Sequence, residues 1–214
     1  MEMEYGVVVV AAGVGSRVGL GYNKVFYRMK TGCTMIEQTL SLFIQDERCK
    51  QIVVVCREEE EKDFKQLCKS EKIEYAYGGA TRSDSVQNGL ANIKTEYVLI
   101  HDGARPWLSN EALNRLLETL ATCHACLLMV PSKDTIKIVE NGVVKTTPNR
   151  DTLWCAQTPQ AFATKLLRDC FKQLPHDVPV SDDASVVERC GYEVKAVMGE
   201  YENRKVTTID DLVF

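Results

Sequence analysis

The sequence predicts an α/β protein with three layers, in which helices cover both faces of a mostly parallel central sheet. Residues 7–10 are four consecutive valines, and such a β-branched run is typical of a strand buried on both faces of a parallel sheet. Strand-like and helix-like segments then alternate along most of the chain, which is the order that builds βαβ units. At 132–149 this alternation breaks, because two short alternating segments flank Asn141-Gly142 and predict an inserted β-hairpin arm.

The expected elements can be placed in order from their patterns. After the strand at 7–10 we expect a helix at 35–43, where Met35, Ile36, Leu40 and Phe43 recur at helical spacing. The next expected elements are a strand at 51–56, a charged helix at 58–69, a strand at 73–77, a helix at 82–92, a strand at 97–101, a helix at 111–122 and a strand at 125–130. Beyond the arm we expect helices at 164–173 and 182–190 and a strand at 193–198. In a sheet of this kind, ligands bind at the carboxyl ends of the strands.

Length and composition fit one domain spanning residues 1–214, with the arm at 132–149 as its insertion. The chain is 45% hydrophobic, which is enough for a full core, and its net charge of −4 argues against a nucleic-acid-binding protein. No apolar run approaches the ~18 residues that a membrane span needs, so we expect no membrane partner. The N-terminal residues are acidic, unlike those of a signal peptide.

Nine cysteines are scattered through the chain. The one Cys-x-x-Cys pair, Cys123 and Cys126, has no second pair at zinc-ligand spacing. Buried reduced thiols are therefore favoured over a metal or redox site, and a cytoplasmic location is expected.

The loop after the first strand reads Ala-Ala-Gly-Val-Gly-Ser-Arg over 11–17 and is followed by Lys24. Its first residues have almost no side chain, and Gly13 and Gly15 can adopt the positive φ that curls a backbone around an anion. Arg17 and Lys24 then add two positive charges. This combination indicates a polyphosphate site, and the alternative is a plain strand-to-helix turn.

Polar residues also follow the strand expected at 97–101. Asp102 comes at the strand end, where a carboxylate can hold a magnesium ion that bridges phosphate oxygens. The alternative for Asp102 is a salt bridge to Arg105. Gly103 and Ala104 again leave the backbone open, and His101 is expected to be a packed, hydrogen-bonded residue and not a catalyst.

Three further loops carry candidate residues. Ser85 follows Gly78-Gly79 and is either a contact to base or ribose or a helix cap. Arg150 follows the arm and Lys205 lies near the C-terminus, and each is either a clamp for a second anionic substrate or a solvated surface charge. The arm itself is either a solvated flap or an element that packs on a second subunit, and we favour the subunit contact.

Taken together, these motifs resemble the 2-C-methyl-D-erythritol 4-phosphate cytidylyltransferases of the non-mevalonate isoprenoid pathway. They occur in the order of that family over nearly the whole chain. The motifs that carry the resemblance are Ala11-Ala12-Gly13-Val14-Gly15-Ser16-Arg17 with Lys24; Gly78-Gly79 with Arg82, Asp84, Ser85 and Gly89; His101-Asp102-Gly103-Ala104-Arg105-Pro106; Lys133-Asp134-Thr135; Arg150 with the segment Leu-Trp-Cys-Ala-Gln-Thr-Pro-Gln at 153–160; Asp182-Asp183-Ala184-Ser185 with Glu188; and Asn203 with Lys205, Val206 and Thr207.

The resemblance implies a nucleotidyltransferase (Rossmann-like) fold that uses CTP and Mg²⁺ and forms a homodimer through the arm. It implies nucleotide contacts from Ala11, Ala12, Gly13, Gly15, Gly79, Ser85, Asp102, Gly103 and Ala104. Substrate contacts are implied for Arg105, Thr135 and Thr158. Arg17 and Lys24 match residues that stabilise charge on the triphosphate, Arg150 and Lys205 match residues that position the sugar phosphate, and Asp102 matches one that contacts magnesium. Thr135 and Arg150 match positions near a site shared between subunits.

The chain departs from the family pattern at Asn23, where a proline usually precedes the lysine, so we expect the loop carrying Lys24 to be less rigid. Ala80 stands at a position that is often acidic. The expected reaction joins CTP to 2-C-methyl-D-erythritol 4-phosphate and releases pyrophosphate. Two rival hypotheses are a ribitol-5-phosphate cytidylyltransferase, which shares the nucleotide half, and a non-catalytic nucleotide-binding relative, which Asn23 and Ala80 motivate.

Overall fold

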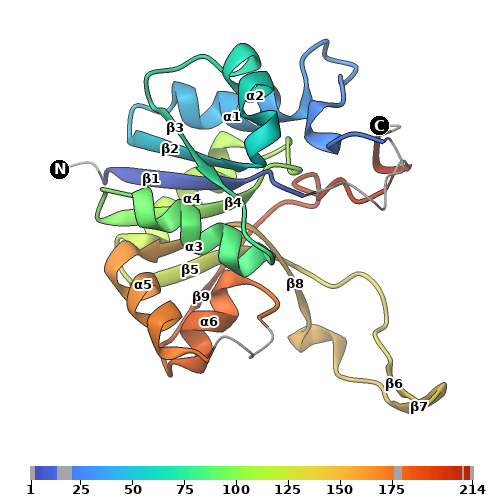
Figure 1. Cartoon of the computed structure of the whole chain (residues 1–214). Helices are drawn as coiled ribbons and strands as arrows, with labels where there is room; N and C mark the ends of the chain where they lie inside the picture. Colours follow the sequence, from blue (N-terminus) through green and yellow to red (C-terminus); the bar gives the residue numbers. More distant parts are fainter. Residues whose placement is uncertain (1–2, 14–20, 176–179, 209, 213–214) are drawn as a thin grey trace.

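The computed structural model describes the whole chain except residues 1–2, 14–20, 176–179, 209 and 213–214. Within that part, seven strands form one sheet in the order β3-β2-β1-β4-β8-β5-β9, and helices lie on both of its faces (Figure 1). The pairs β1–β2, β1–β4, β2–β3 and β5–β9 are parallel, and only β8 runs antiparallel to its neighbours. The predicted three-layer, mostly parallel α/β fold is confirmed.

The predicted elements occur in the expected order, and β8 and the short 3₁₀ helices are additions to it. The described elements are β1 (Tyr5–Val10), η1 (Lys24–Phe26), α1 (Met35–Gln45), β2 (Cys49–Cys56), η2 (Glu58–Glu60), α2 (Glu61–Leu67), β3 (Ile73–Tyr77), α3 (Arg82–Asn92), β4 (Tyr97–Asp102), α4 (Asn110–Leu120), β5 (Ala125–Pro131), β6 (Ile138–Glu140), β7 (Val143–Thr146), η3 (Arg150–Thr152), β8 (Trp154–Ala163), α5 (Thr164–Gln173), α6 (Asp183–Arg189), β9 (Lys195–Met198) and η4 (Asp210–Leu212). The helix expected at 58–69 is divided, since its first turn is the 3₁₀ helix η2.

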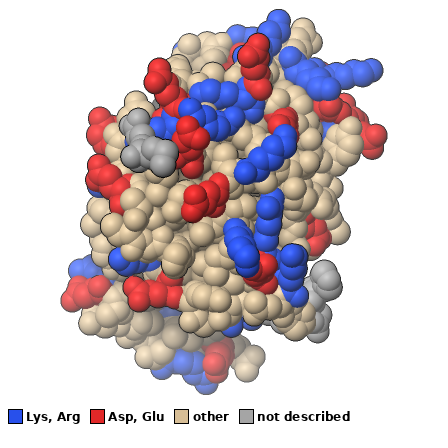
Figure 2. All heavy atoms as spheres, turned by 90° about the vertical axis from the view of Figure 1, so that its left-hand side faces the viewer, with Lys and Arg blue, Asp and Glu red and all other residues tan. Residues whose placement is uncertain are grey.

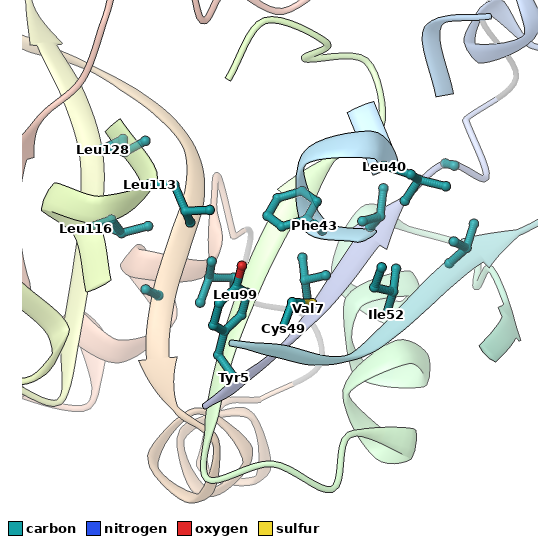
Figure 3. Packing of buried hydrophobic residues seen from close by; sticks show 14 of the residues in the cluster. Tyr5, Val7, Leu40, Phe43, Cys49, Ile52, Leu99, Leu113, Leu116 and Leu128 are labelled. Atoms are coloured by element: carbon teal, nitrogen blue, oxygen red, sulfur yellow. The ribbon is translucent and has the colours of Figure 1, made fainter. Parts of the chain in front are cut away.

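The valine run of β1 explains the two-sided core. Successive side chains of a strand point to opposite faces, so Val7 and Val9 pack beneath α1 and α4, whereas Val8 packs beneath α3. The first of these cores also contains Leu40 of α1 and Leu113 of α4, which lie close to the sheet in Figure 3. The second core is completed by buried residues of α5 and α6.

The sequence analysis did not predict β8, although it occupies the middle of the sheet between β4 and β5. Pro159 within this segment argues against an interior strand, because proline has no N–H to donate to a neighbouring strand. In the structure, Pro159 falls where pairing with β4 has ended and where the register with β5 shifts, between the pairs Leu127–Gln160 and Met129–Ala156. At this irregularity no neighbouring strand accepts a hydrogen bond from position 159, so a proline there does not interrupt β8.

The arm contains the predicted hairpin. β6 and β7 pair with each other and belong to no other sheet, and they project from the body of the molecule (Figure 1). Asn141 and Gly142 connect them with φ values of 50° and 76°, and two positive φ values in a two-residue connection are the reason for the Asn-Gly pair.

All the parallel strands end at the same edge of the sheet, and β8 begins there. The loops that carried the candidate residues therefore meet at this edge, on the right of Figure 1. Figure 2 shows the opposite side of the molecule, where basic and acidic side chains are interspersed and neither sign gathers into a patch.

Candidate active site

A cavity of about 680 Å³ opens at the carboxyl edge of the sheet, between the loops that follow β1, β3 and β4. The predicted site residues that line it are Ala11, Ala12, Gly13, Lys24, Gly79, Ser85, Asp102, Ala104 and Lys205. Most of the nucleotide-binding residues expected from the sequence are thus brought together. Gly15 and Arg17 lie outside the described residues.

A second cavity of about 300 Å³ adjoins the first. Arg82, Asp102 and Lys205 line both cavities. Arg105 and Thr158, two of the expected substrate contacts, line only the second. The two cavities therefore meet at one carboxylate and two cations.

Asp102, the last residue of β4, is the centre of this junction. Its Oδ2 lies 2.8 Å from Lys205 Nζ and 3.6 Å from Arg105 Nε, and its Oδ1 lies 3.4 Å from Arg82 Nε. Burial alone would raise the pKa of this carboxyl, but the cations, with Arg82 the strongest, hold it well below its usual range. Asp102 is therefore ionised at neutral pH, and its salt bridge to Arg105, the alternative to a metal role, is present.

Lys24 reaches the cavity from the 3₁₀ helix η1. Its Nζ donates to the carbonyl of Val206 at 2.6 Å, and the N–H of Val206 donates to the carbonyl of Ala104 at 2.9 Å. These bonds hold the C-terminal segment that carries Lys205 against the loop after β4. Lys24 and Lys205 are thereby fixed on the wall of the same cavity.

The residue before Lys24 is buried and anchored by hydrogen bonds, although the missing proline led us to expect a less rigid loop. Asn23 is 2% exposed and caps η1, because its Oδ1 accepts from the N–H of Val25. Its Nδ2 donates to the carbonyl of Ala11 and to Glu60 at 3.0 Å. Asn23 thus ties the lysine loop to the loop after β1.

The loop after β3 is shaped by close packing. A side chain on Gly78 would bring a Cβ within 2.6 Å of the Cβ of Ala12, and one on Gly79 would overlap Asp84. Ser85 accepts from the N–H of Gly79 at 3.0 Å and donates to the carbonyl of Thr81, so its hydroxyl shapes the loop as well as facing the cavity. The helix-cap interpretation of Ser85 is wrong, because Thr81 is the N-cap of α3 and Ser85 lies inside that helix, whereas its contact to base or ribose stays a prediction.

Thr158 is held by a chain of hydrogen bonds through His101. The N–H of Asp102 donates to Thr158 Oγ1 at 3.0 Å, the same oxygen lies 3.0 Å from His101 Nδ1, and His101 Nε2 lies 3.2 Å from the carbonyl of Arg105. Burial lowers the pKa of His101 to about 4, so the ring is neutral at pH 7. His101 is a packed residue, as predicted.

Three predicted residues lie outside both cavities. Gly103 is buried behind the wall, where an added Cβ would stand 3.1 Å from the carbonyl oxygen of Val10. Its lack of a side chain thus serves packing, whereas we expected it to open the backbone to a ligand. Thr135 and Arg150 are exposed on the arm and at its base, and in one chain neither lines a cavity.

The sequence analysis left Arg82 out of the candidate site residues, and it gave no role to Asp183. Arg82 Nη2 donates to Asp183 Oδ2 at 2.8 Å, which joins the first turns of α3 and α6. The available signal was a cation at the start of a helix, directly after a glycine loop that follows a strand. Asp183 gave no such signal, because its partner is about 100 positions away.

Asp102 can accept a divalent cation only as part of a larger ligand set. Among the described residues, no group of three His, Cys, Asp or Glu side chains is placed to hold a metal ion. A single carboxylate nevertheless suits Mg²⁺ where phosphate oxygens and water complete the shell. Asp102 lines the larger cavity beside Lys24 and Lys205, where a polyphosphate has room to supply those oxygens. The donor set therefore fits magnesium bound together with a nucleotide.

All nine cysteines fall in the described residues and are unpaired thiols. Five are buried, and Cys155 is exposed. Burial raises the pKa values of Cys49, Cys56 and Cys68 to about 12, which keeps these thiols protonated and unreactive. The expectation of buried reduced thiols is confirmed for most of them. No helix among the described residues is long and apolar enough to cross a bilayer.

Comparisons with known proteins identify one family. The family model of 2-C-methyl-D-erythritol 4-phosphate cytidylyltransferase (IspD) matches residues 5–214. The enzyme of that name from Bacillus velezensis is 44% identical, with 99% of this chain and 94% of the relative aligned, and that from Clostridioides difficile is 40% identical, with 97% and 90% aligned.

Solved structures agree as well. The 4-diphosphocytidyl-2C-methyl-D-erythritol synthase of Anaerococcus prevotii superposes with a TM-score of 0.88 at 33% identity, covering 100% of this chain and 94% of that one. The 2-C-methyl-D-erythritol 4-phosphate cytidylyltransferase of Thermus thermophilus gives a TM-score of 0.82 at 32% identity, with coverages of 99% and 96%. These matches favour neither a ribitol-phosphate enzyme nor a non-catalytic relative. Matched by the family model over residues 5–214 and by these relatives over nearly its whole length, the chain belongs to the 2-C-methyl-D-erythritol 4-phosphate cytidylyltransferase family.

Proposed function

We propose that this protein joins CTP to 2-C-methyl-D-erythritol 4-phosphate, forming 4-diphosphocytidyl-2-C-methyl-D-erythritol and pyrophosphate. The observation that carries the proposal is the pair of adjoining cavities, which share Arg82, Asp102 and Lys205 at their junction. Two anionic substrates that react with each other need separate places and one common, positively charged boundary. The family membership supplies the identity of the two substrates.

CTP is assigned to the larger cavity. Its phosphates lie against the loop after β1, where Ala11, Ala12 and Gly13 line the wall without large side chains, and this loop includes Gly15. The nucleoside lies toward Gly79 and Ser85, with Ala104 contributing from the loop after β4. Lys24, together with Arg17, neutralises the charge that develops on the triphosphate.

The sugar phosphate is assigned to the smaller cavity. Arg105 supports this assignment, because its buried Nε makes no hydrogen bond among the described residues and has only the 3.6 Å ion-pair contact to Asp102. Its Nη1 donates to the carbonyl of Asn203 at 2.7 Å, which fixes the side chain. A phosphate oxygen would give Nε a hydrogen-bond partner. Thr158 lines the same cavity, and Lys205 faces both substrates.

In the reaction, an oxygen of the sugar phosphate attacks the α-phosphorus of CTP in line with the leaving pyrophosphate. The new P–O bond forms as the bond from the α-phosphorus to the bridging oxygen of the β-phosphate breaks, and that electron pair leaves on pyrophosphate. A phosphate monoester is largely ionised at pH 7, so a general base is not required. The work of the protein is to bring two anions together and to stabilise the added charge, which cations and fixed dipoles achieve.

Mg²⁺ is proposed as the cofactor, held by Asp102 and by phosphate oxygens of CTP. When bound, it neutralises charge on the triphosphate and favours departure of pyrophosphate. Lys205 lies 2.8 Å from the same carboxylate, so Asp102 also holds this lysine at the boundary between the two substrates.

We further propose that two copies associate through the arm at 132–149. Val139 and Val144 face each other across the hairpin and are 53% and 56% exposed, which is unfavourable for apolar side chains unless another surface covers them. Association of this kind would bring Thr135 and Arg150 of each chain toward the partner's sugar phosphate. Nucleic acid and membrane are not among the proposed partners, and the cytoplasm suits a protein with nine unpaired thiols.

The test is turnover with purified protein, Mg²⁺, CTP and one sugar phosphate at a time, followed by release of pyrophosphate. We expect 2-C-methyl-D-erythritol 4-phosphate to be the preferred substrate and chelation by EDTA to stop the reaction. Faster turnover with ribitol 5-phosphate would establish the rival enzyme. Binding of CTP without release of pyrophosphate would establish a non-catalytic relative.

A further inference from the structure

Arg82 stands at the place where the two substrates must meet. It is the first residue of α3, directly after the N-cap Thr81, and its side chain lines both the larger and the smaller cavity. Asp102 and Lys205 are the other residues common to the two cavities, and both already have a proposed role. Arg82 is therefore a cation at the junction to which no role has yet been given.

The guanidinium of Arg82 is aimed by a carboxylate outside both cavities. Arg82 Nη2 donates to Asp183 Oδ2 at 2.8 Å, and Asp183 is 1% exposed and lines neither cavity. By comparison, the contact from Arg82 Nε to Asp102 Oδ1 is 3.4 Å long. The shorter bond to the buried partner shows that Asp183, more than Asp102, fixes where the guanidinium points.

One nitrogen of the Arg82 guanidinium makes no hydrogen bond within the described part of the chain. Nε and Nη2 have the partners just described, whereas Nη1 has no partner among the described residues. The side chain is also 32% exposed, so it is accessible from the cavities. A guanidinium that is anchored on one side and has an unused N–H on the other suits binding of a phosphate oxygen.

We propose that Arg82 is a further catalytic residue, which donates to phosphate oxygens where the new P–O bond forms, and that Asp183 is its positioning residue. This inference rests on the proposed function, since it assigns the junction of the cavities to the reacting phosphates. Asp183 acts on the reaction only through Arg82, because it touches neither cavity.

The test compares R82Q, R82K, D183N and the double variant R82Q/D183N with the wild-type enzyme. For each protein, kcat and the KM for either substrate are measured by pyrophosphate release, the Kd for CTP by calorimetry and the Tm by circular dichroism. R48Q is the matched control, because Arg48 forms an ion pair of the same length, 2.8 Å, with Asp46 at the opposite edge of the sheet.

We expect R82Q to lower kcat about 100-fold, as does the loss of a donor to a developing charge. R82K should recover part of that loss. Lysine keeps the positive charge, but it cannot bond Asp183 on one side and a phosphate oxygen on the other as the planar guanidinium does. D183N should lower kcat roughly 10-fold to 100-fold through misplacement of Arg82. The double variant should be no slower than R82Q, and R48Q should lose stability but keep its kcat.

Other outcomes separate this inference from the proposed function. An active wild-type enzyme with R82Q near its normal kcat would overturn the role of Arg82. If the effects of D183N and R82Q on kcat multiply, Asp183 does not act through Arg82. A loss confined to Tm in both single variants would make the ion pair purely structural. A wild-type protein that binds CTP and turns over no sugar phosphate would overturn the proposed function and this inference together.

Discussion

The side-chain amide of Asn23 donates to the backbone carbonyl of Ala11 at 2.7 Å and so connects the loop that carries Lys24 to the loop that follows β1. The same side chain also bonds Glu60 and the N–H of Val25. Three hydrogen bonds to a buried amide thus join the two loops at the position where the family pattern led us to expect a proline.

Asn23→Ala should therefore impair both stability and turnover. Removing the amide leaves the buried carbonyl of Ala11 and the N–H of Val25 without their partner, which costs about 1–3 kcal/mol of unfolding free energy. Urea unfolding measures this loss, and kcat should fall because Lys24 is no longer held. Asn114→Ala serves as the control, because that side chain is exposed and, within the described part of the chain, bonds only Arg48. Equal unfolding free energies for N23A and the wild type would show that the amide does not anchor the loop.

Lys24→Ala should keep the fold but slow turnover at least ~100-fold, because a cation that faces the triphosphate is lost. The bond from Lys24 to the carbonyl of Val206 lies at the cavity wall and not in either large core, so the Tm should change little. Steady-state kinetics with saturating CTP tests this expectation. A near-normal rate would remove Lys24 from the mechanism.

The free energy of unfolding should fall as the pH is lowered from 6.5 to 4. Burial lowers the pKa of His101 from 6.5 to about 4, so in this window the unfolded chain binds a proton that the folded chain does not. The loss reaches about 3 kcal/mol near pH 4. The lowered pKa of Asp102 acts only below its ordinary value of 3.8, outside this window.

His101→Gln is the matching variant, since glutamine keeps a donor and an acceptor but does not titrate. Urea unfolding at several pH values should give a flatter dependence between pH 6.5 and 4 than the wild type gives, whatever the absolute stability of the variant. Parallel curves for the two proteins would assign the pH dependence to other groups.

Substituting the exposed apolar pair of the arm should break the proposed dimer. Val139→Lys combined with Val144→Lys places two charges on a surface that would be buried between subunits, which disfavours association. Sedimentation should show a shift from dimer to monomer with the circular dichroism spectrum unchanged. Lys62→Ala, an exposed substitution on α2, is the control. A wild-type protein that sediments as a monomer would refute the arm contact directly.

The fold was largely predictable from the sequence because the apolar pattern of each parallel strand is local information. The valine run of β1 and the Asn-Gly turn of the arm each determine their own structure. The strand β8 was not predictable in this way. Its proline obeys a local rule against interior strands, and only the register shift between β5 and β8 makes it acceptable.

The same distinction applies to the candidate site. Residues next to strand ends, such as Asp102 and Gly79, could be placed because strand ends meet at one edge. Asp183 could not, since its relation to Arg82 joins two helices across about 100 positions. The anchoring by Asn23 was also missed, because the pattern showed a missing proline and not the hydrogen-bond partners that replace it. The sequence of a segment determines whether it forms a strand or a turn. Which buried polar side chains bond to each other depends on how distant segments pack in the folded protein.

The arrangement of strand ends also divides the molecule into two regions under different constraints. The cavities and the root of the arm occupy one edge, whereas the connections at 46–48, 93–96 and 121–124 lie on the other. Evolution can therefore lengthen those distant turns, or protein engineers can graft a fluorescent reporter there, while the chemistry stays intact. One edge of the sheet therefore carries the reaction, and the opposite edge is available for changes that do not touch it.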